Sequence, residues 1–250
     1  MSTLSLAAVH TKYNLLETAR VPIAVIGSLA FPTLAFCLFV LPQRTVVENP
    51  EFATAAIASM VVFAFMSAGL FSIGLDLAEQ RAKPWAPYLR TLPGAPAARI
   101  VGLMTATLVV ATLAMVPLLV IGAVFTAADP EPLDTLAAIG LVIVTAVPSA
   151  LIGVIIGTTC GPKAAIAVTQ VAMFLLAFGG GLFLPPVMFP DWLDAVSMTL
   201  PVRQAREIVV GTATGTGAPL WAVIGILVWT LVLGVVAVWL YRRDEGRRYR

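Results

Sequence analysis

The chain has 250 residues and a net charge of +2, and 60% of its residues are hydrophobic while only 11% are charged. A soluble domain carries about 25% charged residues, so a water-soluble fold could not cover this much apolar surface. The composition therefore predicts an all-α integral membrane protein, a single domain over residues 1–250, with membrane lipids as its solvent. Nothing in the net charge indicates a nucleic-acid partner. Cys37 and Cys160 lack the spacing of a metal site or a disulfide framework.

An amphipathic helix is predicted over residues 5–20. Its apolar side chains share one helical face, and they are Leu6, Val9, Tyr13 and Leu16. A helix of this kind lies in the interface between membrane and water. An ordinary soluble helical arm is the alternative interpretation.

Six apolar runs follow, each close to the ~20 residues that a helix needs to cross the hydrocarbon layer. We place the spans near 21–41, 52–75, 100–126, 135–157, 164–185 and 219–241. Apart from Asp76 at a boundary, these runs contain no Asp, Glu, Lys, Arg or His, and Gln170 is the most polar side chain well inside a span. Ionisable groups inside a bilayer normally mark a proton or ion relay, so their absence argues against a carrier driven by a proton gradient.

The distribution of basic residues predicts the orientation of the spans. Twelve of the fifteen Lys and Arg residues fall in the N-terminal arm, the loops after the second and fourth spans and the C-terminal tail. Since basic residues accumulate in cytoplasmic segments, both termini are expected in the cytoplasm of a multi-pass plasma-membrane protein. The segment between the fifth and sixth spans then faces outward.

The loop at 76–99 is the largest cytoplasmic connection. Within it, charged side chains alternate with aromatic and aliphatic ones: Glu79, Arg81, Lys83 and Arg90 with Trp85, Tyr88, Leu89 and Leu92. A short helix with charge on one side and apolar anchors on the other suits an interface with a partner protein. A charged loop that only enforces topology is the alternative.

Glycines recur in two places. Gly153, Gly157 and Gly161 are spaced by four residues, which allows helix backbones to approach closely, either within one chain or at a seam between subunits. Gly179, Gly180 and Gly181 follow one another near the outer end of the fifth span. They favour either a flexible outer gate or a close approach of the returning chain to the span.

Proline breaks define the segment that follows. Pro186, Pro190 and Pro201 each interrupt helix formation because proline lacks the N–H that a helix requires. Trp192 lies between them, with apolar neighbours on one face, and tryptophan is favoured at the membrane–water boundary. We predict an outward re-entrant helical hairpin at 186–201.

The order of these residues resembles the last third of the type-2 ABC exporter permeases. The resemblance is carried by Leu182-Phe183, Pro186, Pro190, Trp192-Leu193, Pro201 and Glu207, and in the cytoplasmic loop by Glu79, Arg81, Leu89, Arg90 and Pro93. It covers nearly the full chain. The family commonly has a second acid and a glycine where this chain has Ala82 and Pro84, which puts the exact turn of the loop in doubt.

The resemblance implies roles for individual residues. A cytoplasmic coupling helix would dock on an ATPase through Glu79, Arg81, Trp85, Leu89, Arg90 and Pro93. In the family the second and fifth spans line the central path of a dimer, so the large, adaptable Met60, Phe63, Met66, Phe71, Met173 and Phe174 become candidates for the substrate path. An outer hairpin or gate would comprise Gly179, Gly180, Gly181, Pro186, Pro190, Trp192 and Pro201.

The function that the resemblance implies is that of a permease subunit in an ATP-driven exporter of a drug or antibiotic, a lipid or a glycolipid. The chain has no P-loop and one histidine, His10, so no catalytic site is expected in it. ATP and Mg would be bound by two separate ABC ATPase subunits, and a second permease, identical or homologous, would complete the assembly. A non-transporting membrane scaffold or assembly factor is the first alternative, and a secondary carrier is the second.

Overall fold

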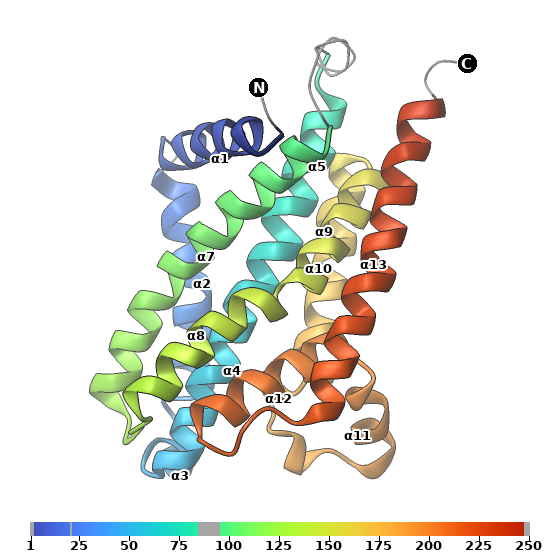
Figure 1. Cartoon of the computed structure of the whole chain (residues 1–250). Helices are drawn as coiled ribbons and strands as arrows, with labels where there is room; N and C mark the ends of the chain where they lie inside the picture. Colours follow the sequence, from blue (N-terminus) through green and yellow to red (C-terminus); the bar gives the residue numbers. More distant parts are fainter. Residues whose placement is uncertain (1–2, 21, 85–95, 248–250) are drawn as a thin grey trace.

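The computed structural model describes residues 3–20, 22–84 and 96–247, and every regular element in these ranges is helical (Figure 1). The elements are α1 (Thr3–Ala19), α2 (Pro22–Phe39), α3 (Arg44–Val47), α4 (Pro50–Ala68), the π-helix η1 (Gly69–Ile73), α5 (Gly74–Ala82), α7 (Pro96–Phe125), α8 (Pro132–Thr145), α9 (Val147–Thr159), α10 (Pro162–Gly179), the 3₁₀-helix η2 (Pro186–Met188), α11 (Asp191–Met198), α12 (Pro201–Ala213) and α13 (Leu220–Arg247). The predicted all-α class is confirmed for these ranges.

Five helical segments are long and apolar enough to cross a membrane. They are Pro50–Ala82, Ala98–Phe125, Pro132–Thr159, Pro162–Gly179 and Leu220–Leu240. Each overlaps one of the last five predicted spans. The first predicted span, 21–41, corresponds to α2, a helix of 18 residues.

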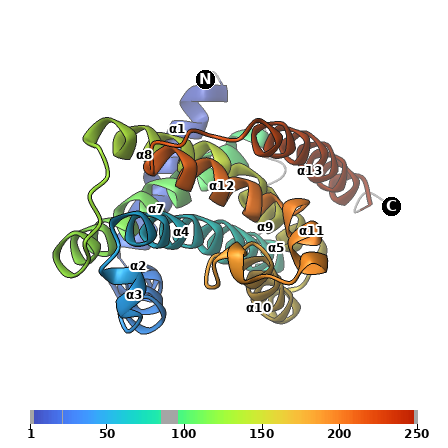
Figure 2. The ribbon, with the colours of Figure 1, turned by 90° about the horizontal axis from the view of Figure 1, so that it is seen from below.

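The helices form a bundle with two distinct ends. Figure 1 shows α1, the end of α5 and the C-terminal part of α13 at one end, and α3, α11 and α12 at the other. Figure 2, a view onto this second end, shows α11 and α12 beside α4 and α10. The expected coupling loop and the proline-rich hairpin therefore belong to opposite ends of the bundle.

A seam of glycines brings η1 and α5 close to α9. A Cβ at Gly153 would lie 2.3 Å from the carbonyl oxygen of Gly69, and one at Gly157 would lie 2.8 Å from that of Gly74. No larger residue fits at such distances, so these glycines serve packing within one chain, one of the two predicted alternatives. Nothing lies within 4 Å of a Cβ at Gly161, the third residue of the pattern.

Helix α1 packs across α7 through small and polar side chains. Ala7 is buried, and the Thr11 hydroxyl donates a hydrogen bond to the carbonyl of Gly102 at 3.3 Å. Of the four residues predicted on the apolar face, Val9, Tyr13 and Leu16 are exposed, and Leu6 is half-buried. An interfacial helix would present such side chains to lipid.

The outer end of the fifth span differs from the prediction. Helix α10 ends at Gly179 and does not continue to 185, because the chain turns at Gly181, whose φ is +74°. The predicted hairpin at 186–201 consists of η2 and α11, and a further helix, α12, follows it. Most of α12 is buried against α4, α8 and α13. The sequence analysis did not predict this helix.

Two glycine variants test the seam. Gly153→Ala should lower the free energy of unfolding by about 1–3 kcal/mol, because its methyl group would collide with the Gly69 carbonyl. Gly140→Ala is the matched control, since it also lies inside a helix but has nothing within 4 Å of its Cβ. Thermal unfolding of the detergent-solubilised proteins measures both, and equal melting temperatures would contradict the seam.

Candidate functional site

A cavity of about 330 Å³ lies among α2, α4, η1, α7 and α10, and we call it the central cavity. Its walls are largely apolar, with Phe31, Phe71 and Met173 as the largest side chains. Gln170, the most polar side chain predicted inside a span, contributes an amide to this cavity. A mostly apolar cavity with a few polar groups is typical of a site for a small hydrophobic or amphipathic ligand.

The six residues predicted for the substrate path divide into three groups. Phe71 and Met173 line the central cavity. Met60, Phe63 and Met66 are fully buried in the core. Phe174 is 44% exposed on α10 and is not part of the cavity wall.

An aromatic cluster joins the central cavity to the turn after α10. The ring of Phe63 lies 5.8 Å from that of Phe31, which lines the cavity, and 4.8 Å from that of Phe183. Phe183 also contacts Phe39 and Phe178, with ring centroids 5.1 and 5.2 Å apart. The Leu182-Phe183 pair of the sequence pattern therefore packs next to the cavity wall.

A second cavity, of about 370 Å³, lies among α1, η1, α5 and α7, and we call it the inner cavity. Its wall carries Glu17, Asp76, Glu79 and Lys83 alongside apolar residues of α7. Ser72 and Val110 line both cavities, so the two adjoin at η1. A polar compartment continues here into an apolar one, an arrangement that suits an amphipathic molecule.

The predicted coupling residues are described in part. Glu79 is exposed in the wall of the inner cavity. Arg81 is half-buried and donates a hydrogen bond from Nη1 to the carbonyl of Gly157 at 2.9 Å, which links α5 to the end of α9. Trp85, Leu89, Arg90 and Pro93 lie outside the described residues.

The three consecutive glycines at the outer end of α10 allow the returning chain to approach closely. A Cβ at Gly179 would lie 3.0 Å from Leu200, and one at Gly180 would lie 2.7 Å from Val202. Gly181 makes the turn with a positive φ, and its Cβ would lie 2.8 Å from Pro186. Of the two predicted roles, close approach is the one found here.

The prolines of the hairpin lie at element boundaries. Pro186 begins η2, Pro190 directly precedes α11, and Pro201 is the first residue of α12, where its missing N–H is not needed. Trp192 is 69% exposed on α11, as a side chain at the membrane–water boundary would be.

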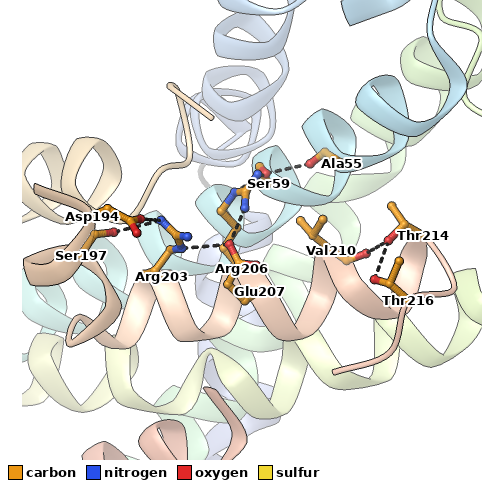
Figure 3. Close-up of polar contacts among 10 residues, drawn as sticks. All are labelled: Ala55, Ser59, Asp194, Ser197, Arg203, Arg206, Glu207, Val210, Thr214 and Thr216. Carbon is orange, nitrogen blue, oxygen red and sulfur yellow. Dashed lines mark hydrogen bonds and ion pairs between the residues drawn. The ribbon is translucent and has the colours of Figure 1, made fainter. Parts of the chain in front are cut away.

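Helix α12 carries a buried cluster of charges that the sequence analysis had placed in an outward loop (Figure 3). The Oε1 atom of Glu207 accepts hydrogen bonds from Arg203 Nε at 2.9 Å and from Arg206 Nη1 at 2.7 Å. Arg203 Nη1 also pairs with Asp194 of α11 at 3.1 Å. The spacing of 203 and 207 predicts an ion pair on a helix, but burial of the pair leaves no sign in local sequence.

One contact connects this cluster to the rest of the bundle. The Nε atom of Arg206 donates to the hydroxyl of Ser59 on α4 at 3.1 Å. The Ser59 hydroxyl in turn donates to the carbonyl of Ala55 at 2.7 Å, within α4. Both hydrogen bonds are drawn in Figure 3.

Neutralising Glu207 should destabilise the protein. Glu207→Gln leaves two buried guanidinium groups facing an uncharged amide, and breaking a buried pair in this way costs about 3 kcal/mol. Asp129→Asn, in an exposed loop, is the control and should change stability little. Thermal unfolding in detergent compares the two, and a Glu207→Gln protein as stable as the control would show that the cluster contributes nothing.

Comparison with known proteins gives a consistent class. No protein-family model matches the chain. The chain is 24% identical over 228 residues to a Bacillus subtilis (strain 168) protein named "Putative transport permease YvfS", covering 89% of this chain and 91% of that protein. The similarity thus extends over nearly the whole helical bundle.

Proposed function

We propose that this chain is the membrane-spanning permease subunit of an ABC exporter of the type-2 class. The observation that carries the proposal is the pair of adjoining cavities, polar at one end of the bundle and apolar inside it. The near full-length similarity to a transport permease supports it. The cargo is an amphipathic or hydrophobic molecule of the drug, lipid or glycolipid kind.

The energy for transport comes from partner proteins. The three lysines, Lys12, Lys83 and Lys163, do not occur in a P-loop sequence. Two ATPase subunits that bind ATP and Mg would dock on the loop at 76–99, and a second permease, identical or homologous, would face this one. ATP-driven closure of the ATPases would then shift α5 and α9, which Arg81 connects.

The distribution of basic residues sets the direction of transport. With both termini in the cytoplasm, the inner cavity opens toward the cytoplasmic side of the plasma membrane and the hairpin faces outward. Cargo would enter by the inner cavity, move into the central cavity and leave past Phe183 and the hairpin. The path is then outward, as in an exporter.

Partner identification followed by reconstitution tests the proposal. The chain is purified from native membrane, and a co-purifying ATPase with a P-loop is expected. Vesicles containing both proteins should accumulate amphipathic dyes with ATP, and should fail when the P-loop lysine of the partner is replaced. No ATPase partner and no nucleotide-dependent transport would favour the scaffold alternative, whereas transport that needs only a proton gradient would favour a secondary carrier.

Filling the central cavity should block transport. Ala68 lines this cavity, and Ala68→Phe would occupy the space of the cargo. We expect transport to fall about tenfold, a loss of about 1.4 kcal/mol in cargo binding. Leu175→Phe, on the exposed surface of α10, adds an aromatic ring outside the cavity and should transport normally. Equal transport by the two variants would place the cargo elsewhere.

Removing the charge of Glu79 should uncouple transport from ATP hydrolysis. Glu79→Gln keeps the size of the side chain, so expression and assembly with the ATPase should be unchanged while cargo-stimulated ATPase activity and transport both fall. Glu79 is preferable to Arg81 for this test because Arg81 also bonds to the backbone of α9. Glu131→Gln, at the opposite end of the bundle, is the control. A fully active Glu79→Gln protein would contradict the coupling role.

A further inference from the structure

We infer that α11 and α12 form a movable outer gate that separates from α4, and that the hydrogen bond between Arg206 and Ser59 keeps this gate closed. The inference rests on the proposed function, because the gate would close the outer end of the export path. Its evidence is the way in which the charges, hydrogen bonds and cavities around α12 are distributed between neighbouring helices.

The charged cluster is neutral within the gate itself. Arg203, Arg206 and Glu207 belong to α12, and Asp194 belongs to α11, so two positive and two negative groups lie on the gate. Their ion pairs connect gate residues only to one another. Moving the gate therefore leaves no charge unpaired in the bundle, which would otherwise oppose the motion strongly.

The gate is held closely by α13. Trp229 of α13 donates a hydrogen bond from Nε1 to the carbonyl of Thr199, in the turn between α11 and α12, at 2.8 Å. The side chain of Gln204 packs directly on Gly225 of α13, where an added Cβ would lie 2.4 Å from the amide carbon. These contacts favour a gate that remains attached to α13.

The contact with α4 is weaker. Among the described residues, the hydrogen bond from Arg206 to Ser59 is the side-chain hydrogen bond that joins α12 to α4, and it ends on a neutral hydroxyl. Figure 3 shows Arg206 reaching out to Ser59, while the other charged groups stay beside α11 and α12. Opening on this side thus breaks one hydrogen bond and leaves every ion pair intact.

The seam between α12 and α4 is also incompletely packed. A largely apolar cavity of about 220 Å³ is lined by Val209 and Ala213 of α12 and by Thr54 and Ala58 of α4, with α7 and α8. On the other side of Arg206, a smaller void lies beside Val202 and Ala205. Interiors are normally packed without such voids, so contact along this seam is unusually easy to break.

Thiol labelling on intact cells tests the gate. Cys37→Ser and Cys160→Ser remove the native thiols, and a single cysteine is then introduced as Ala213→Cys, a buried position on the seam where the cavity has room for the sulfur. A membrane-impermeant maleimide reaches it only when the gate opens. Ser59→Ala is the latch variant.

Three controls accompany this measurement. Thr54→Val is matched to Ser59→Ala, because it removes a buried hydroxyl of α4 that bonds only within its own helix. Asp191→Cys, exposed at the start of α11, reports whether the hairpin faces outward. Ala177→Cys, buried on α10 away from the seam, reports general loosening of the protein.

A gate latched by Arg206 and Ser59 predicts a specific pattern. Labelling at Ala213→Cys should be on the order of tenfold faster with Ser59→Ala than with Thr54→Val, since a hydrogen bond to a charged group is worth about that factor. Ala177→Cys should stay protected in both. Equal labelling at Ala213→Cys in the two variants would overturn the latch, as would an equal rise at Ala177→Cys.

The failure of this inference can be distinguished from failure of the proposed function. If Asp191→Cys reacts only after permeabilisation, the hairpin faces inward and both are wrong. If the expected labelling occurs but reconstituted vesicles move no cargo, the latch stands and export does not. If vesicles transport cargo while Ser59→Ala labels like its control, export stands without this latch.

Discussion

The pairing of Glu207 with two arginines is the interaction that allows α12 to lie inside the bundle. A helix with three charged residues within five positions would normally remain in water, because burial of an unpaired charge costs several kcal/mol. Glu207 Oε1 accepts from Arg203 and Arg206 together, and Asp194 completes the balance. The buried position of α12 in turn fixes the path of the hairpin, the turn at Gly181 and the close approach to the end of α10.

Features with a local cause could be predicted from the sequence. The apolar runs indicated the last five spans, since the length and hydropathy of a helix reside in its own residues. The spacing of Gly153 and Gly157 indicated a close helix contact, and the structure supplies the partners, Gly69 and Gly74. The break in helix near Pro186 was also expected, because proline acts on its own backbone and that of its neighbour.

Features that depend on distant residues could not be predicted in this way. Arg206 is 147 positions from its acceptor Ser59, so nothing near it indicates burial. The size of Met60 and Phe63 made them candidates for the substrate path, but large apolar side chains fill a core equally well, and that is where both lie. Phe71 and Met173 reach the central cavity because of the faces on which they lie. The helix end at Gly179 likewise depends on Leu200 and Val202, which arrive from beyond the turn.

The π-helix η1 makes the length of this segment as important as its composition. Its hydrogen bonds join residues five apart, so it holds one residue more than an α-helical turn of the same rise would. A chain shorter by one residue here would keep every helix but rotate all that follows by about 100°, the angle between neighbouring residues of an α-helix. Glu79 would then take the buried place of Ala78 against α9, and the acid would leave the wall of the inner cavity. Homologous chains can therefore differ freely in side chains along Gly69–Ile73, but scarcely in the count of residues.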